Sequence, residues 1–316
     1  MNTQWSALAG MAGLALLTQA DIVSAAAVTL DVVSLAPRVL LVRPETQVGN
    51  PTTIALLGDE ETWLLDASIP VSAAAIDSML VHRGVKPVTK VITSHAHRDH
   101  TDGLVHWLAR GASGVATVEQ VARMKGSPVI APALESGEIA LPTDTVADTR
   151  TLQIEMDGVP VDVQLLRPKD RSGHTDGDLF AYLPSVSVLY VGDYYFFDRF
   201  PIIGVNEGGG LEGYLAAIDW ITNEFPEETK VIPGHNTFAP TVPAVPSLAE
   251  FKAWRADLQR TIDWITSQRS AGLTADAIVA KGLPSEFGRL SEKPRYVPEE
   301  RWIRFVLDAT AQPDQE

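Results

Sequence analysis

A run of metal-capable side chains directly after a short apolar stretch is the feature that most restricts how this chain can fold. His95, His97, Asp99 and His100 follow residues 90–93, which have the pattern of a short strand. A tight loop after a strand can turn two of these side chains to one side and two to the other, so that two neighbouring metal ions share one loop. Alone, the run would also suit a solvated loop of mixed charge.

Three further segments each carry a metal-capable side chain beside the end of an expected strand. His174 precedes one strand, Asp193 closes another and His235 follows a third, and each has a glycine before it. A rigid sheet can aim side chains at its strand ends, and glycine lets the backbone turn sharply there. Together with the first run, these residues predict a metal site held by strand ends.

Expected strands and helices follow one another in the same order twice along the chain. In the first half we expect strands at 28–35, 38–42, 53–57, 62–66 and 90–93, and helices at 72–82, 103–110 and 118–124. In the second half we expect a hairpin at 151–156 and 159–166, strands at 179–183, 186–191 and 230–232, and a helix at 211–225. This repetition predicts an α/β fold of two β-sheets packed face to face with helices outside.

Composition removes several classes of function. The chain has 316 residues, of which 45% are hydrophobic, so it can bury the core of one large α/β domain or two smaller ones. It contains no cysteine, which excludes disulfides, thiolate metal sites and cysteine nucleophiles. Its net charge of -15 repels phosphate backbones and argues against a nucleic-acid partner. Any metal must be held by imidazole and carboxylate groups, which suit zinc, iron or manganese.

Residues 1–27 have the pattern of a cleaved signal peptide. An apolar run at 7–17 is followed by a polar break and by small residues at Ala25 and Ala27. The first five residues carry no Lys or Arg, so an ordinary terminal helix is the competing interpretation. The run is too short for a comfortable membrane span, and we expect no stable membrane insertion after processing. The expected location is periplasmic or secreted, with a cytoplasmic protein as the alternative.

The ordered set of metal-capable residues resembles the signature of the metallo-β-lactamase superfamily. The resemblance rests on His95-x-His97-x-Asp99-His100, then His174, Asp193 and His235, and covers about residues 30–240. It implies an αββα sandwich of two mixed β-sheets with outer helices, which agrees with the pattern of strands and helices. It also implies two divalent ions, with Zn²⁺ expected first and Fe or Mn as alternatives.

The resemblance divides the ligands into two groups that share one carboxylate: His95, His97 and His174 for the first ion, Asp99, His100 and His235 for the second, and Asp193 bridging both. Asp66 ends an expected strand where family members usually carry an aspartate, although Ala67-Ser68 departs from the usual Thr-Gly turn. Asp66 would orient a ligand histidine from behind. A simple turn aspartate is the competing interpretation.

The same resemblance suggests how the chain is divided and which side chains meet a substrate. Residues 28–245 would form the catalytic domain, and 246–316 a helical extension packed on it, with helices expected at 247–268, 274–281 and 298–311. These helices would shape the substrate cleft or mediate a homodimer, and both roles stay open. Four residues beside ligand positions are candidates for substrate contact: Tyr194, Tyr195, Arg199 and Asn236. An aromatic run after a strand is also typical of core packing.

The implied activity is metal-dependent hydrolysis of a small-molecule substrate. A hydroxide shared by two ions would attack a carbonyl carbon, and Asp99 would orient the hydroxide and move its proton. A bridging carboxylate at the position of Asp193 is typical of glyoxalase II-like and lactonase-like members. This favours an ester, thioester or lactone, with β-lactams as a side activity. The stretch 192–201 also resembles exported or periplasmic members of the superfamily.

Other interpretations use the same fold. A sulfur-dioxygenase-like enzyme would hold one iron ion and leave the second site incomplete, whereas every second-site ligand is present here. RNA-processing members share these ligands, but the acidic charge weighs against them. A non-catalytic metal-binding accessory protein would need the same ligands, so only activity separates it from a hydrolase.

Overall fold

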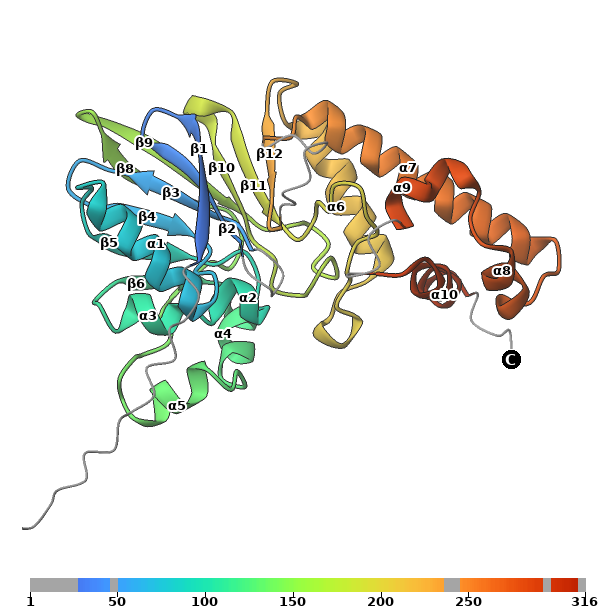
Figure 1. The fold of residues 1–316 in the computed structure, drawn as a ribbon, viewed down its shortest axis with the longest axis horizontal. Coiled ribbons are helices and arrows are strands. Elements are labelled where there is room, and N and C mark those ends of the chain that lie inside the picture. Colours follow the sequence, from blue (N-terminus) through green and yellow to red (C-terminus); the bar gives the residue numbers. More distant parts are fainter. Residues whose placement is uncertain (1–27, 46–50, 236–244, 292–296, 312–316) are drawn as a thin grey trace, which may run out of the picture.

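Two β-sheets packed face to face form the centre of the protein, with helices on both outer sides (Figure 1). The computed structural model describes residues 28–45, 51–235, 245–291 and 297–311. This architecture confirms the predicted sandwich of two mixed sheets with outer and C-terminal helices. The segment 1–27, where the sequence predicts a signal peptide, and Asn236 lie outside the described residues.

The first sheet has seven strands that follow one another in sequence order. They are β1 (Thr29–Ala36), β2 (Val39–Glu45), β3 (Thr53–Leu57), β4 (Thr62–Leu65), β5 (Val88–Ile92), β6 (Ser113–Ala116) and β7 (Asp144–Thr145). Short connections make β1 to β4 antiparallel, whereas helical crossovers make β4 to β7 parallel. The carboxyl ends of β4 and β5 therefore lie side by side.

The second sheet has five strands in the order β12-β11-β10-β9-β8. They are β8 (Arg150–Met156), β9 (Val159–Leu166), β10 (Phe180–Leu183), β11 (Val188–Gly192) and β12 (Lys230–Pro233). β11 and β12 are parallel, and β10 runs antiparallel to β11. The start of β10 thus lies beside the ends of β11 and β12, so residues far apart in sequence meet at one edge of this sheet.

Strand alternation distributes the apolar side chains over three cores. Leu41 packs between the sheets with Ile54 and Val163, while its neighbours Leu40 and Val42 face the helices outside the first sheet. This follows from the period of two along a strand. A third core joins the outer face of the second sheet to the C-terminal helices. Both sheets are therefore covered on both faces.

The helices lie in two outer layers (Figure 1). The first sheet is covered by α1 (Pro70–His82), α3 (Leu104–Leu108), α4 (Val118–Met124) and α5 (Ile130–Glu135). The second sheet is covered by α6 (Leu211–Glu224) and α7 (Leu248–Ser270), and α8 (Ala275–Lys281) and α10 (Glu299–Ala309) pack on α7 in turn. Two further helices of four residues are α2 (Arg98–Thr101) and α9 (Gly288–Ser291).

The C-terminal helices are fixed to the sandwich by capping and by buried aromatic contacts. Ser247 and Glu250 form a reciprocal capping box that starts α7. Buried Trp302 of α10 donates its indole N–H to Thr261 Oγ1 of α7 at 2.9 Å and stacks on Phe200. Within the described ranges, no helix is both long and apolar enough to cross a membrane.

Short or interrupted elements are where the sequence expectations differ from the fold. β6, β7 and α5 were not expected, because four, two and six residues are too few to show a period. The strand expected at 186–191 begins only at Val188, since a 3-10 turn (Pro184–Val186) and left-handed Ser187 (φ 50°) take up its first residues. The neighbouring strands keep their register across this turn.

Candidate metal centre

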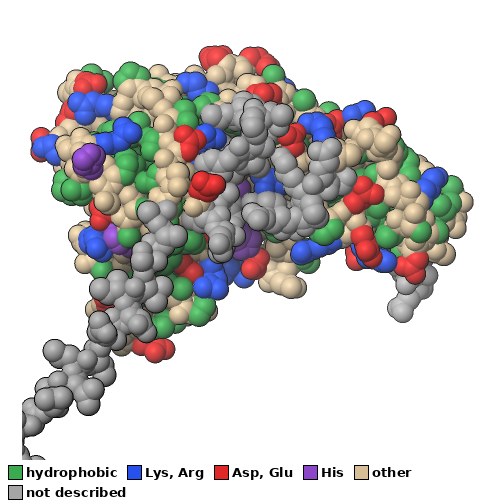
Figure 2. All heavy atoms as spheres, viewed as in Figure 1, with side chains coloured by type: hydrophobic (Ala, Val, Ile, Leu, Met, Phe, Trp, Pro, Cys, Tyr) green, Lys and Arg blue, Asp and Glu red, His purple; other side chains and the backbone are tan. Residues whose placement is uncertain are grey.

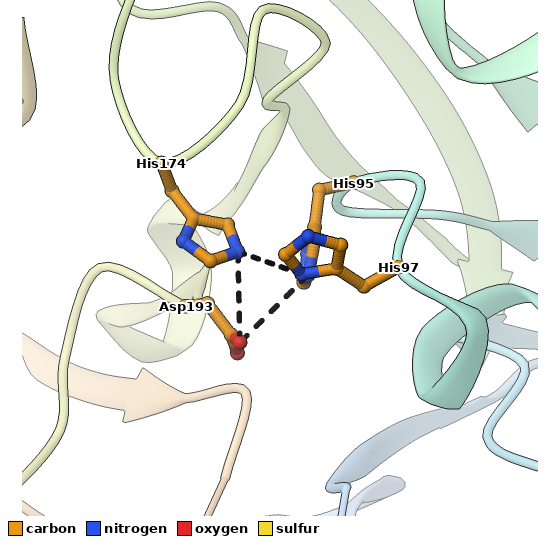
Figure 3. Close-up of side chains that lie close together, drawn as sticks. All are labelled: His95, His97, His174 and Asp193. Carbon is orange, nitrogen blue, oxygen red and sulfur yellow. Dashed lines mark hydrogen bonds and ion pairs between the residues drawn. The ribbon is translucent and has the colours of Figure 1, made fainter. Parts of the chain in front are cut away.

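The ends of β5, β11 and β12 and the start of β10 bring seven side chains to one edge of the sandwich. They form two groups whose candidate ligand atoms lie within 4.8 Å of one another: His95, His97, His174 and Asp193 in the first, and Asp99, His100 and His235 in the second. All seven metal-ligand candidates from the sequence are thus brought together. Figure 3 shows that His95 and His97 come from one loop and His174 and Asp193 from two others, and that all four side chains point toward one centre.

Distances in the first group suit donors around a single ion. His97 Nδ1 lies 3.1 Å from His95 Nε2 and 3.0 Å from His174 Nε2. Asp193 Oδ2 lies 3.8 Å from His95 Nε2 and 3.7 Å from His174 Nε2. Tetrahedral donors with bonds of 2.0–2.1 Å would be about 3.3–3.4 Å apart. The group therefore has nearly the spacing that a four-coordinate cation requires.

The second group is completed by the same aspartate. His100 Nε2 and His235 Nε2 are 3.1 Å apart, and Asp99 Oδ2 lies 3.3 Å from His235 Nε2 and 3.9 Å from His100 Nε2. Asp193 Oδ1 is 3.5 Å from His100 Nε2, and Oδ2 is 3.3 Å from His235 Nε2. One carboxylate therefore contacts both groups.

Hydrogen bonds on the far side of the rings fix where the imidazole lone pairs point. His174 Nδ1 donates to the carbonyl of Ile202 at 2.8 Å, and His97 Nε2 donates to Glu207 Oε2 at 2.8 Å. A neutral ring that carries its proton on one nitrogen presents a lone pair at the other. Both rings therefore direct lone pairs toward the centre of the first group.

The same logic holds for the two rings nearest Asp66. His100 Nδ1 donates to Asp66 Oδ2 at 2.6 Å. Ser94 Oγ donates to Asp66 Oδ2 at 2.7 Å, so it accepts from His95 Nδ1 at 3.0 Å. In the neutral form of each ring, His95 Nε2 and His100 Nε2 thus carry the lone pair and face inward. Together with His97 and His174, four lone pairs converge without a proton between them.

The donor set fits divalent cations. Asp193 Oδ1 is buried and accepts no hydrogen bond from the residues that the structure describes. A buried carboxylate oxygen without a donor, surrounded by inward lone pairs, is costly unless a cation satisfies it. Five imidazoles and two carboxylates, one of them shared by both groups, are ligands typical of zinc, iron and manganese.

Burial and charge keep most of these groups in their metal-binding forms. Burial lowers the pKa of His174 to about 4 and lowers the pKa of His95 well below its ordinary value. Burial raises the pKa of Asp193, but the charges of His235 and His100 outweigh it, and its pKa falls well below the usual range. At neutral pH His95 and His174 are therefore neutral and Asp193 is ionised. Burial lowers the pKa of His100, but the charges of Asp193, Asp66 and Asp99 outweigh it and raise that pKa.

Asp66 organises the base of the second group. It follows β4, adopts φ 67° and accepts from Ser94 N at 2.6 Å and from Tyr190 Oη at 2.6 Å, besides the bond from His100. All of these groups are buried. The carboxylate therefore joins the ends of β4, β5 and β11 and sets the orientation of His100.

We expect Asp66→Asn to weaken metal binding at the second group by about 10–100-fold, because the amide cannot accept from His100 and Ser94 as the carboxylate does. Competition with a fluorescent zinc chelator measures this affinity. Asp59→Asn is the matched control, since Asp59 accepts only backbone N–H groups of the hairpin at 157–158 and an arginine. Equal affinities in the two variants would contradict the role of Asp66.

The loop that carries His174 is held by a tyrosine and a buried carboxylate. Tyr194 Oη accepts from His174 N at 3.0 Å and donates to Asp178 Oδ2 at 2.7 Å. Asp178 also accepts from the N–H and hydroxyl of Thr175. Burial raises the pKa of Asp178 to about 6. Tyr194 therefore positions the backbone of a ligand rather than facing a substrate.

Gly173→Ala should destabilise the protein by about 1–3 kcal/mol, the usual cost of overpacking a tight site. A Cβ at Gly173 would lie 1.5 Å from Tyr194 Oη, so the His174 loop would have to move. Chemical denaturation measures the loss, and chelator competition should show weaker binding at the first group. Gly288→Ala is the control, because a Cβ there meets nothing within 4 Å. Equal stability of both variants would contradict this packing.

A cleft of about 660 Å³ opens beside the two groups and reaches His97 and Asp99. Its other polar lining residues are Arg98, Arg123, Ser127, Thr175 and Glu207. The substrate-contact candidates Tyr194, Tyr195 and Arg199 are buried and are not among the lining residues. Tyr195 packs on Phe251 and Trp254, so the aromatic run after β11 contributes to the core.

Apart from His97 and Asp99, no sequence pattern indicates the residues that line this cleft. Glu207 belongs to a glycine-rich turn that precedes α6. The glycines allow close approach, since a Cβ at Gly209 would lie 2.4 Å from the carbonyl of His174. This approach brings Glu207 against His97, which no local pattern predicts.

Comparison with known proteins gives one family and one fold. The family model described as the metallo-beta-lactamase superfamily matches residues 47–235. A metallo-beta-lactamase from Pontibacter korlensis has a TM-score of 0.56 at 17% identity, covering 72% of this chain and 98% of that chain. The DIM-1 metallo-beta-lactamase has a TM-score of 0.54 at 16% identity, covering 72% and 97%. At such identities the structural likeness shows the fold alone. No curated protein matches the sequence significantly.

Proposed function

Because the chain belongs to the metallo-β-lactamase superfamily, we propose that it is a dinuclear metallohydrolase that cleaves an ester, thioester, lactone or β-lactam, with Zn²⁺ as the first candidate metal. The observation that carries this proposal is the convergence of four imidazole lone pairs on two groups that share Asp193. A purely structural histidine cluster would need protons between these nitrogens, and the outward hydrogen bonds remove them.

Each ligand has a defined part in this proposal. His95, His97 and His174 would hold one cation, and Asp99, His100 and His235 the other, with Asp193 shared. The bound cations would supply a water acidified toward neutral pH and an electrophile for the carbonyl oxygen. The burial of most of these side chains excludes bulk water from them.

Asp99 is the candidate for proton transfer. It belongs to the second group and also lines the cleft, so it can face both the attacking water and the substrate. Burial raises the pKa of Asp99, but interactions with His100 and His235 lower it by a larger amount. The net shift is downward, which keeps the carboxylate ionised. An ionised carboxylate at this point can take a proton from the water and return it to the leaving group.

Two observations support a carbonyl substrate over a nucleic acid. The net charge is -15, which opposes a polyanionic phosphate backbone. Figure 2 shows Asp and Glu side chains interspersed with Lys and Arg on the visible face. The contact of Asp193 with both groups matches the glyoxalase II-like and lactonase-like pattern. This supports an ester, thioester or lactone before a β-lactam.

A panel of chromogenic substrates tests the proposal. We expect the zinc-loaded protein to hydrolyse at least one of a lactone, a thioester, an aryl ester and a cephalosporin, and to lose this activity with a chelator. A phosphodiester in the same panel should not be cleaved. One bound iron ion with no hydrolysis would support an oxygen-dependent enzyme instead, and two bound ions with no hydrolysis would support a metal-binding accessory protein.

A further inference from the structure

The polar side chains of the cleft differ in how many of their hydrogen-bonding groups already bind other residues of the protein. Ser127 Oγ donates to Asp102 Oδ1 at 2.6 Å, and Thr175 Oγ1 donates to Asp178 Oδ1 at 2.6 Å. Glu207 accepts from His97. Hydroxyl protons and carboxylates that are engaged in this way have little to offer a substrate.

The two arginines of the cleft are held in different ways. Arg123 is bound through Nε and Nη2 to both oxygens of Asp176, at 3.1 and 2.5 Å. Arg98 is held only through Nε, which donates to Asp102 Oδ2 at 3.0 Å. Among the described residues, no partner is recorded for Nη1 or Nη2 of Arg98. Within the described part of the chain, Arg98 is therefore the cleft arginine with both terminal nitrogens uncommitted, whereas Arg123 leaves only Nη1.

The hydrogen bond to Asp102 restrains the orientation of the Arg98 guanidinium. The Asp102 side chain is 4% exposed, whereas that of Arg98 is 59% exposed. Asp102 is itself fixed by Ser127, whose hydroxyl accepts from the N–H groups of Val129 and Ile130. A buried carboxylate thus anchors the Nε side of the guanidinium, on a side chain that lines the cleft, and leaves its two coplanar Nη groups for a ligand. Such a pair of donors matches a planar carboxylate.

We infer that Arg98 binds a carboxylate of the substrate, separate from the carbonyl group that is cleaved. Arg98 lines the same cleft as His97 and Asp99, so this carboxylate would lie in the cleft that reaches the two metal groups. A carboxylate carries one negative charge, so the net charge of -15 repels it less than it would repel a doubly charged phosphate group. The inference rests on the proposed hydrolase function and narrows its substrate class to acidic esters, thioesters or lactones.

A matched pair of esters tests the inference in the zinc-loaded protein. 4-Nitrophenyl butyrate is neutral, and mono-4-nitrophenyl glutarate carries a carboxylate at the end of a similar acyl chain. We expect Arg98→Gln to lower the ratio of kcat/KM for glutarate ester over butyrate ester by about tenfold or more, mainly through KM. Arg98→Lys should give an intermediate ratio, because it keeps the charge and loses the fork. Arg110→Gln is the control, since Arg110 is 56% exposed and pairs with Asp77 outside the cleft.

A binding measurement separates this inference from the proposed function. Calorimetry of glutarate and butyrate with the zinc-loaded protein needs no turnover, and glutarate should bind more tightly in the wild type but not in Arg98→Gln. If neither ester is hydrolysed, carbonyl-ester hydrolysis fails while calorimetry still decides the role of Arg98. An unchanged ester ratio together with unchanged glutarate affinity would overturn the inference, as would an equal loss for both esters and both acids.

Discussion

Asp193→Asn is expected to leave the protein unable to hold two cations at once. The carboxylate lies 3.3–3.8 Å from imidazole nitrogens of both groups, and an amide supplies one weak neutral acceptor in its place. Losing one cation removes several kcal/mol of charge stabilisation, so kcat/KM should fall on the order of 10³-fold. Elemental analysis after dialysis, together with hydrolysis rates, measures both effects.

The control for this variant is the same Asp-to-Asn substitution a few residues away. Asp198→Asn changes an aspartate of the same loop that pairs with Arg289 at 3.0 Å, and asparagine tolerates its left-handed φ of 60°. It should retain two cations and its activity. Two tightly bound cations in Asp193→Asn would show that the two groups do not depend on a shared carboxylate.

Asp99→Asn should reduce kcat by about 10²–10⁴-fold even when both cations are supplied in excess, because the variant lacks the base that takes the proton of the attacking water. Asp99 is suited to this role because it contacts His235 at 3.3 Å and also lines the cleft. The measurement is kcat at saturating metal, with bound metal determined on the same sample. Near-normal turnover in a metal-replete variant would exclude Asp99 from proton transfer.

These predictions share one physical basis, the fixed orientation of the imidazole rings. Asp66, Ser94, Glu207 and the carbonyl of Ile202 each bind the outer nitrogen of a ring. Repulsion between the inward lone pairs therefore lowers the stability of the folded metal-free protein, and bound cations would remove this repulsion. It follows that saturating metal should raise the unfolding temperature, since only the folded chain assembles the site.

Strand ends explain why the fold and the ligand set could be predicted from the sequence. His95, Asp193 and His235 each follow a strand with a clear apolar pattern, and parallel pairing of β11 with β12 brings the last two together. The predicted sandwich and the superfamily are confirmed. The ligands follow one another along the chain in the order typical of the superfamily. The sequence therefore reveals the set, although its members are far apart along the chain.

The cleft could not be predicted in the same way, because it depends on how loops pack. Tyr194 and Tyr195 stand beside Asp193 in sequence, yet the backbone after β11 turns both into the core. Glu207 is 110 residues from His97 and meets it only through a glycine-rich turn. No sequence pattern indicates the role that we infer for Arg98 in substrate binding. That role depends on the contact with Asp102, whose burial the sequence does not show. Sequence adjacency to a ligand is thus a poor guide to substrate contact.

A zinc titration of chelator-stripped protein tests the central claim most directly, with bound metal and hydrolysis of the best panel substrate followed on the same samples. A dinuclear hydrolase predicts saturation at two equivalents and a rate that rises with metal and is absent without it. Saturation at one equivalent, or hydrolysis that persists in the stripped protein, would contradict the account.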